Sequence, residues 1–269
     1  MILSWRRIWG TTFRHLIQFP TDFNKLSSTF YWPFMDILVF GYLSIGMSTG
    51  SPTIKTMALL SNIILWQVVN RANLCVSLDL LEEFWASNIL NLFATPLKLG
   101  EWVLATFLDG AIVNVFLIIF CIVCTWAIFG FNLLVLGWWI IPLFLLSLMS
   151  GLAIGIFCTC FLLMSGSSVQ SLAWMVSWGF SLFSGVFYPI EVLPAWLQVI
   201  AKSLPFHHTF DAVALLIERQ GNTIIATREI WERLFYSFAT NCLFLGIVLL
   251  CFAAAFSYSK RKGLARLCD

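Results

Sequence analysis

Apolar residues fill six long segments of the chain, and short polar stretches separate them. The segments cover residues 29–47, 57–78, 99–129, 138–164, 169–188 and 234–258. A helix needs about 20 consecutive apolar residues to cross the hydrocarbon core of a bilayer. The third and fourth segments are longer, which permits tilt or extension beyond the hydrocarbon. The pattern predicts an all-α, polytopic membrane protein with six transmembrane helices.

The composition agrees with this prediction. Of the 269 residues, 60% are hydrophobic and 10% are charged, whereas a soluble domain has about 25% charged residues. Seven of the eight cysteines lie within apolar segments, where cysteine acts as a small hydrophobic residue, so no disulfide framework is expected. Gly151 and Gly155 are spaced so that another helix can approach closely. We find no internal repeat and no soluble domain, so residues 1–269 form a single transmembrane domain.

The first 25 residues have an amphipathic pattern. Trp5, Phe13 and other apolar residues recur at helical spacing, and Arg7 and other basic residues occupy the opposite side. An apolar face with tryptophan beside a basic face is typical of a helix that lies in the membrane interface. We therefore expect an interfacial helix over residues 1–25, ended by Pro20. A cytosolic helix packed on a partner is the alternative.

Lysine and arginine are distributed unevenly between the connections. If the N-terminus is cytoplasmic, the inner segments hold ten of these residues and the outer segments hold five. Cytoplasmic loops carry the excess of positive charge, so both termini are expected in the cytoplasm, in agreement with an even number of spans. We expect a multi-pass protein of the cell membrane, and specifically of a bacterial inner membrane.

The outer segment 189–233 carries three prolines, Pro189, Pro194 and Pro205, where apolar runs change direction. Proline fixes φ and removes a backbone donor, so it suits a helix end or a first turn. Two short amphipathic stretches, 193–204 and 206–220, lie between and after these prolines. Both are too short to cross a bilayer. They predict a re-entrant or interfacial helix pair between spans five and six, which protein must bury wherever it lies at membrane depth.

The same stretch carries an ordered motif. It consists of Ser184-Gly185-Val186-Phe187-Tyr188-Pro189, then Leu193-Pro194, Trp196-Leu197 and Leu204-Pro205. This motif resembles the signature of the type-2 ABC exporter permease family, whose members export drugs, lipids, lipo-oligosaccharides and polysaccharide chains. The resemblance implies that the segment is the external helix pair after the fifth span, which caps the export route.

The inner connection 79–98 combines apolar and acidic residues. Phe84, Ile89, Leu92 and Phe93 are expected to line part of a short surface helix that Pro96 ends, beside two glutamates. Such a stripe on a cytoplasmic loop is typical of a docking surface, although an ordinary interfacial helix between spans is the alternative. The resemblance implies a coupling helix that seats in the ATPase subunit. The candidate coupling residues are Glu82, Glu83, Phe84, Leu92, Phe93 and Pro96.

The outer helix pair is a candidate gate, because its apolar stripes cannot be left in water. We expect it to pack between spans five and six, with the prolines at its bends and with Trp196 and Phe206 filling the gap. An interfacial anchor is the alternative, and Glu191 serves equally as an exit-path residue or a surface residue. The candidate gate residues are Pro189, Glu191, Pro194, Trp196, Pro205 and Phe206.

Three ionisable residues lie within the predicted spans: Asp36, Arg71 and Asp109. Such residues are costly in a membrane and are functional candidates by default. A structural hydrogen bond is favoured for Asp36, and Arg71 is placed to snorkel toward the inner interface. Neither acid has an acidic, histidine or arginine neighbour three or four residues away, so a proton relay is not supported. The adjacent His207 and His208 lack the spacing of metal ligands on a helix, and no metal site is expected.

The chain contains none of the motifs that bind or hydrolyse nucleotides, such as a Walker A sequence. By resemblance, two separate ABC ATPase subunits carry ATP and Mg²⁺, and a second permease copy completes the pathway as a homodimer; no nucleic acid and no cofactor of its own is expected. The favoured substrate is an amphipathic drug, a lipid or a lipid-linked glycan, with polysaccharide as the alternative. An intramembrane lipid-modifying enzyme would cluster ionisable residues at one face, and here they are scattered along the sequence. An ion-coupled carrier would show inverted repeats and paired intramembrane charges.

Overall fold

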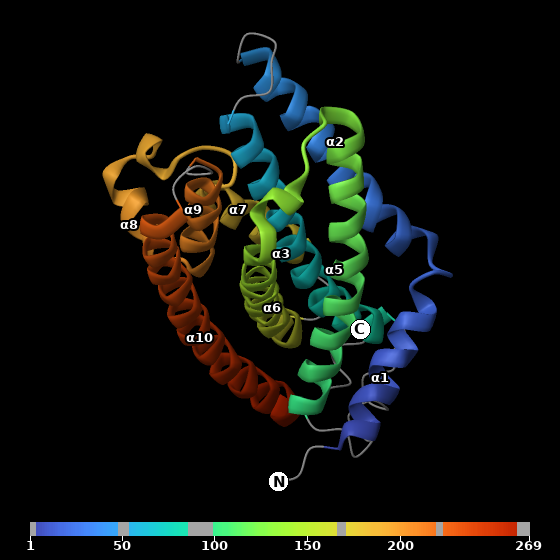
Figure 1. Cartoon of the computed structure of the whole chain (residues 1–269). Coiled ribbons are helices and arrows are strands. Elements are labelled where there is room, and N and C mark those ends of the chain that lie inside the picture. The colour runs from blue at the N-terminus through green and yellow to red at the C-terminus, as the bar shows by residue number, and fades with distance from the viewer. Residues whose placement is uncertain (1–3, 48–53, 86–98, 166–170, 219–222, 263–269) are drawn as a thin grey trace.

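The computed structural model describes residues 4–47, 54–85, 99–165, 171–218 and 223–262, and these are helical, without a strand (Figure 1). The long helices are α2 (Phe23–Met47), α3 (Ile54–Trp85), α5 (Leu99–Phe129), α6 (Ile140–Ser165) and α10 (Thr223–Lys262). The shorter ones are α1 (Trp5–Gln18), η1 (Leu133–Trp139), α7 (Leu172–Ser184), η3 (Ile190–Val192), α8 (Ala195–Ser203) and α9 (Pro205–Glu218). The all-α prediction is confirmed.

Helix α3 is the centre of the bundle. It packs against α2, α5, α6, α7 and α9, and nearly all of its side chains between residues 60 and 81 are buried. Its closest neighbour is α6, because two glycines of α6 face it. A Cβ atom on Gly155 would lie 2.8 Å from the Cβ of Val76, and one on Gly151 would clash with the carbonyl oxygen of Val69. The close helix approach expected from the two glycines is therefore confirmed.

Four segments of the described chain are long and apolar enough to cross a membrane: Phe23–Met47, Gly100–Phe129, Leu133–Ser165 and Arg228–Ser259. They correspond to predicted spans one, three, four and six. Helix α3 has 32 residues, which at 1.5 Å per residue gives about 48 Å, more than the hydrocarbon thickness. It carries Asn62, Gln67, Asn70, Arg71 and Asn73, polar residues that only a protein-covered helix tolerates. The count of six spans stays a prediction.

Three predicted boundaries need correction. In the predicted fifth span, 169–188, the helix ends at Ser184 because Gly185 adopts a φ of 78°, a conformation that terminates helices. Helix α3 continues to Trp85, so the first part of the predicted inner loop 79–98 is helical. Residues 223–233 were assigned to the outer hairpin 189–233, but they form the first turns of the 40-residue α10.

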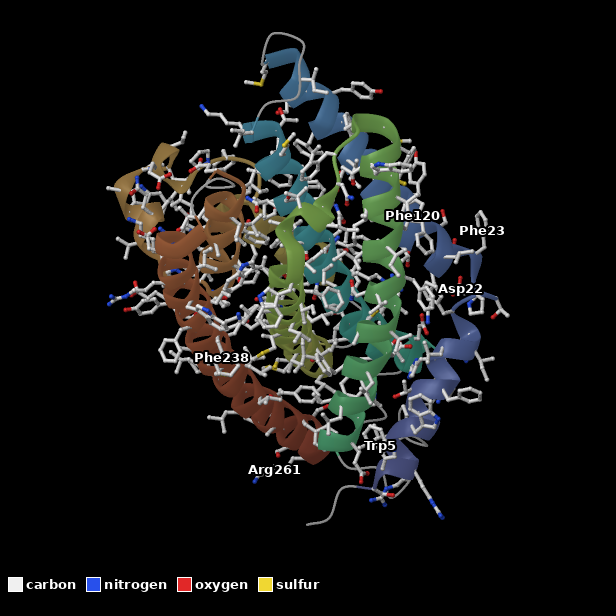
Figure 2. All side chains as sticks on the ribbon, in the orientation of Figure 1. Trp5, Asp22, Phe23, Phe120, Phe238 and Arg261 are labelled. Carbon is white, nitrogen blue, oxygen red and sulfur yellow. The ribbon has the colours of Figure 1, made fainter. Side chains whose placement is uncertain are left out.

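Helix α1 packs on α5 through one narrow face and exposes its aromatic face. Ile8, Thr12 and His15 are buried, whereas Trp5 is 65% and Phe13 is 53% exposed. An apolar stripe that the protein leaves uncovered fits a helix lying against lipid, as expected for residues 1–25. Phe23 on α2 and Phe238 on α10 also point away from the bundle (Figure 2).

The two ends of the bundle differ in which helices they contain. Helices α8 and α9 lie at the upper end in Figure 1, and α1 lies at the lower end. Trp5 of α1 and Arg261 of α10 both lie at this lower end (Figure 2), so the first and last described helices share one side of the molecule. This arrangement agrees with α1 and the last turns of α10 facing one side of a membrane.

Candidate functional site

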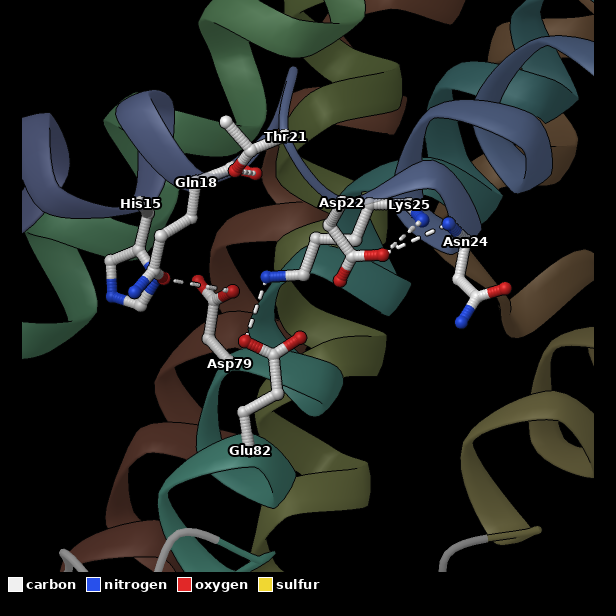
Figure 3. Close-up of polar contacts among 8 residues, drawn as sticks. All are labelled: His15, Gln18, Thr21, Asp22, Asn24, Lys25, Asp79 and Glu82. Atoms are coloured by element: carbon white, nitrogen blue, oxygen red, sulfur yellow. Dashed lines mark hydrogen bonds and ion pairs between the residues drawn. The ribbon is translucent and has the colours of Figure 1, made fainter.

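A polar elbow joins α1 to α2 beside the lower end of α3 (Figure 3). Helix α1 ends at Gln18, two residues before Pro20. Asp22 starts the next helix, because its Oδ1 accepts hydrogen bonds from the backbone amides of Asn24 at 2.9 Å and Lys25 at 3.3 Å. An open groove of about 500 Å³ lies at this elbow, lined by Gln18, Thr21, Asp22, Phe23, Asn24, Lys25 and Glu82.

An ion pair and a histidine–carboxylate pair, which is ionic when the histidine is protonated, fasten the elbow to α3, and Figure 3 shows both. Lys25 Nζ lies 2.7 Å from Glu82 Oε2, and His15 Nδ1 lies 3.5 Å from Asp79 Oδ1. The side chains of His15 and Asp79 are only 4% and 5% exposed, so water competes little for this pair. The elbow therefore moves with α3 for as long as both pairs hold.

A further ion pair fastens α1 to the start of α5. Arg7 Nη2 donates to Glu101 Oε1 at 2.6 Å, and the backbone amide of Ser4 donates to the same oxygen at 2.8 Å. The Glu101 side chain is fully buried. Nearby, Thr12 Oγ1 donates to the carbonyl oxygen of Ala105 at 3.1 Å. A buried carboxylate is retained only with such partners, since its desolvation is otherwise uncompensated.

Two more charged side chains lie behind these pairs. Asp109 is 5% exposed, and its Oδ1 has no hydrogen-bond partner among the described residues. Its charged neighbours are Asp79, His15, Arg71 and Lys25. Arg71 is 7% exposed. We refer to His15, Lys25, Arg71, Asp79, Glu82 and Asp109 together as the charge cluster.

The charge cluster corrects the expectation that ionisable residues are scattered. They are distant in sequence, but α1, α2, α3 and α5 bring them together. The sequence does contain a sign of this cluster. Asp79 follows Arg71 by eight residues and Glu82 follows Asp79 by three, so the three side chains share one face of α3. Spacing within a single helix does not reveal the contacts that a separate helix, α1, makes with these residues. The distribution of ionisable residues therefore does not exclude an intramembrane enzyme.

Two predictions for intramembrane residues have different outcomes. Gln67 Nε2 donates to Asp36 Oδ2 at 2.6 Å, so the structural hydrogen bond favoured for Asp36 is confirmed. Arg71 does not snorkel to solvent. Its guanidinium lies over the ring of Phe19, 5.5 Å from the ring centroid, and is covered by the elbow. This is a cation–π contact, which gains strength when water is excluded.

The predicted coupling residues are only partly described. Glu82 is the partner of Lys25 at the end of α3. Glu83 and Phe84 lie in the last turn of this helix, but their side chains are outside the described part of the chain. Leu92, Phe93 and Pro96 lie outside the described residues altogether. The assigned coupling role therefore stays a prediction, and its described anchor is Glu82.

The candidate gate consists of two short helices, as predicted. Pro189 precedes η3, Pro194 precedes α8, and Pro205 is the first residue of α9, a position that proline favours. Glu191 in η3 is exposed. Whether the pair enters the membrane and acts as a gate stays a prediction.

Trp196 and Phe206 have unlike surroundings. Phe206 is 1% exposed, with its ring centroid 5.9 Å from that of Trp66 and 5.6 Å from that of Phe180. Trp196 is 67% exposed. The two rings therefore do not fill one gap: Phe206 belongs to the core under α9, and Trp196 belongs to the surface of α8.

Comparison with known proteins gives one finding on kinship. The model of a protein family described as "ABC-2 family transporter protein" matches residues 72–258, which include the second part of α3, all of α5 to α9 and most of α10. A search of curated proteins finds no match. The matched range contains Asp79, Glu82 and Asp109 of the charge cluster, and it begins after α1, α2 and Arg71.

Proposed function

The chain belongs to the ABC-2 family of transporter proteins, and we propose that this membrane permease is the transmembrane half of an ATP-driven exporter. The membrane subunits of this family are not catalytic themselves and associate with ABC ATPase subunits. The proposed substrate is an amphipathic drug, a lipid or a lipid-linked glycan that moves outward; a polysaccharide is the alternative within the same family.

The observation that carries the proposal is the course of α3. Its lower end holds Asp79 and Glu82 and leads directly into the predicted coupling segment. Higher up, Trp66 contacts Phe206 and Phe210 of α9, with ring centroids 5.9 and 6.1 Å apart. One buried helix thus connects the predicted ATPase contact to the predicted gate. A displacement of its lower end is transmitted to α9 because packed helices move as rigid bodies.

The proposed assembly contains two copies of this chain and two ATPase subunits, which bind ATP and Mg²⁺. Nucleotide binding to the ATPases favours one of two arrangements of the permease, and the difference in affinity supplies the work. The lower end faces the cytoplasm in this proposal, which the excess of lysine and arginine in the inner segments supports. The membrane is the inner membrane of a bacterium.

A pair of substitutions in the coupling segment tests the proposal. Phe84→Asp and Leu92→Asp place charge in the expected apolar contact with the ATPase. We expect the permease to reach the membrane at normal levels, with at least tenfold less ATPase copurified and with ATP hydrolysis no longer stimulated, since a buried unpaired carboxylate costs several kcal/mol. Val199→Asp, on the exposed surface of α8, is the matched control. Normal ATPase binding by both coupling variants would assign the docking role to another surface.

The charge cluster favours one alternative from a different class. Buried ionisable groups such as Asp109 also occur in ion-coupled carriers. A carrier moves its substrate in vesicles that contain the permease alone, driven by a pH gradient, whereas the proposed exporter requires the ATPase and ATP. Transport measured in both kinds of vesicle separates the two functions.

A further inference from the structure

A small cavity lies beside α3 on the side opposite α6's glycines, between α2, α3, α5 and α7. Its volume is about 20 Å³, enough for one water-sized group. Trp32 on α2 and Trp174 on α7 are 56% and 37% exposed and stand beside it. The lining residues are Ser28, Thr29, Trp32, Pro33, Gln67, Asn70, Arg71, Leu74, Leu117 and Trp174.

The cavity wall includes a guanidinium that lacks an ionic partner within the described chain. Arg71 is more than nine-tenths buried, and its Nε has no hydrogen-bond partner there. No ion pair joins it to a described carboxylate. A buried charge without a close partner is costly. Arg71 has the ring of Phe19 on one side, and its acidic neighbour Asp109 lies beyond ion-pair distance. An anion in the cavity would remove this cost.

Some of the other polar residues of the wall already donate hydrogen bonds within the protein, and one does not. Ser28 and Thr29 donate their hydroxyl groups to the carbonyl oxygen of Lys25, at 3.1 and 2.6 Å. Gln67 donates to Asp36, a residue of α2 that does not line the cavity, at 2.6 Å. The Asn70 amide makes no hydrogen bond within the described chain and is half-exposed. The available donors are thus the amide of Asn70 and the guanidinium of Arg71.

We propose that Arg71 and Asn70 bind the phosphate group of a lipid or lipid-linked substrate that reaches the cavity between Trp32 and Trp174. Arginine matches phosphate because its planar fork donates two parallel hydrogen bonds. One phosphate oxygen occupies the cavity, and the rest of the group lies at its opening. The tryptophan rings, apolar with a polar N–H, suit the boundary between headgroup and acyl chain. This inference rests on the proposed function and narrows its substrate to phosphate-bearing amphiphiles.

The test measures lipid retained by the purified permease–ATPase complex. The complex is exchanged into detergent with equal amounts of phosphatidylglycerol and diglucosyldiacylglycerol of the same acyl chains, and bound lipid is counted by native mass spectrometry. We expect the wild type to retain phosphatidylglycerol preferentially and Arg71→Gln to lose this preference by about tenfold, the effect of a lost charge-assisted hydrogen bond. Arg228→Gln removes the same charge from an 87% exposed position and is the matched control.

Two further variants and a soluble competitor show which feature of the ligand is recognised. Arg71→Lys keeps the charge but loses the fork, so retention should be intermediate. Asn70→Ala, at a half-exposed position that folding tolerates, should reduce the preference about threefold. Millimolar sn-glycerol 3-phosphate competes with the lipid if the natural ligand is a soluble phosphate and does not compete if it is a lipid headgroup.

Two results would overturn the inference. The first is equal retention of phosphatidylglycerol by the wild type, Arg71→Gln and Asn70→Ala. The second is recovery of the preference in the double variant Arg71→Gln, Asp109→Asn, which would make Arg71 a counter-charge to Asp109 alone. Copurification of the ATPase is scored in the same samples. Its presence with unchanged lipid retention refutes the phosphate site only, and its absence refutes the exporter proposal.

Discussion

The lower and upper ends of the bundle are held together by different kinds of contact. At the lower end, ion pairs join α1 and α2 to α3 and α5, including the fully buried carboxylate of Glu101. At the upper end, aromatic rings and hydroxyl groups join α9 to its neighbours in the interior, and one partly exposed ion pair joins Asp211 of α9 to Arg233 of α10. Phe206 packs on Trp66, and Thr209 Oγ1 lies 2.6 Å from Ser237 Oγ, which also donates to the carbonyl oxygen of Pro205 at 3.1 Å.

This difference indicates which end can respond to a signal. The strength of an ion pair depends on the water and charges around it, so a partner that binds at the lower end can change the pairing there. Aromatic packing and hydrogen bonds between neutral hydroxyls respond little to charge, and the Asp211–Arg233 ion pair is partly exposed, so water already screens it. In the exporter proposal, the lower end receives the signal through its ion pairs, and the upper end follows as a packed unit carried by α3.

The largest expected effect tests the packed upper end. Phe206→Ala removes a ring that is 1% exposed, and such a truncation costs about 3–5 kcal/mol of the free energy of unfolding. Trp196→Ala removes a ring that is 67% exposed on α8, so its effect on stability should stay within about 0.5 kcal/mol. Thermal unfolding of both detergent-solubilised variants measures the contrast.

Transport by the same two variants examines the predicted gate. If α8 contributes to the export route, Trp196→Ala alters which substrates are exported while the protein stays as stable as the wild type. Equal destabilisation by the two substitutions would show that Trp196 on α8 is packed as firmly as Phe206 on α9, which would contradict the difference in burial between the two rings.

A smaller effect tests the ion-paired lower end. Glu101→Gln keeps the shape of the side chain but removes the charge that faces Arg7 and the amide of Ser4. The expected loss is about 2 kcal/mol, the value of a charge-assisted hydrogen bond to a buried group. Glu232→Gln is the matched control, because Glu232 pairs with Arg228 on the exposed surface of α10, where an ion pair contributes about 0–1 kcal/mol.

Proteolysis shows whether the loss of stability in the Glu101→Gln variant comes from α1. Trypsin should cleave within α1 of the Glu101→Gln variant faster than in the wild type, since the helical backbone at Arg7 and Arg14 can unfold into the protease once this helix detaches from α5. An unchanged cleavage pattern together with unchanged stability would mean that burial of Ile8 and Thr12 alone holds α1 in place.

The sequence predicted most of the helices and the reason is hydropathy. Residues 99–129 form one long, mostly apolar segment, and α5 has those same bounds. Hydropathy reports contact with lipid, however, and says nothing of where a helix continues into polar sequence. The extensions of α3 to Trp85 and of α10 back to Thr223 were missed for that reason.

The candidate site was harder to predict. Asp36, Arg71 and Asp109 were recognised because ionisable residues in apolar segments are conspicuous. His15, Lys25 and Asp79 were not, because they look like ordinary residues of an interfacial helix or a loop. The role of these three residues depends on the bend at Pro20 and Asp22. This bend directs α1 along α5 and places His15 beside Asp79. A contact between separate helices cannot be inferred from the periodicity of either one.

The smallest expected effect concerns pH and the upper end. Burial, together with the neighbouring His208, lowers the pKa of His207 to about 4, and Arg233 and Lys202 act in the same direction while Glu191 opposes them. In the unfolded chain the pKa of histidine is about 6.5. Between these values the unfolded state binds more protons, so stability is fully present above pH 6.5 and falls as the pH drops toward 4. Burial also lowers the pKa of His208, which adds to the same trend.

His207→Gln should therefore lessen the loss of melting temperature between pH 7 and pH 5. Glu101→Gln at the lower end should leave that loss unchanged, because Glu101 does not contact this histidine pair. The same pH dependence in the wild type and in His207→Gln would show that protonation of α9 does not weaken the upper end.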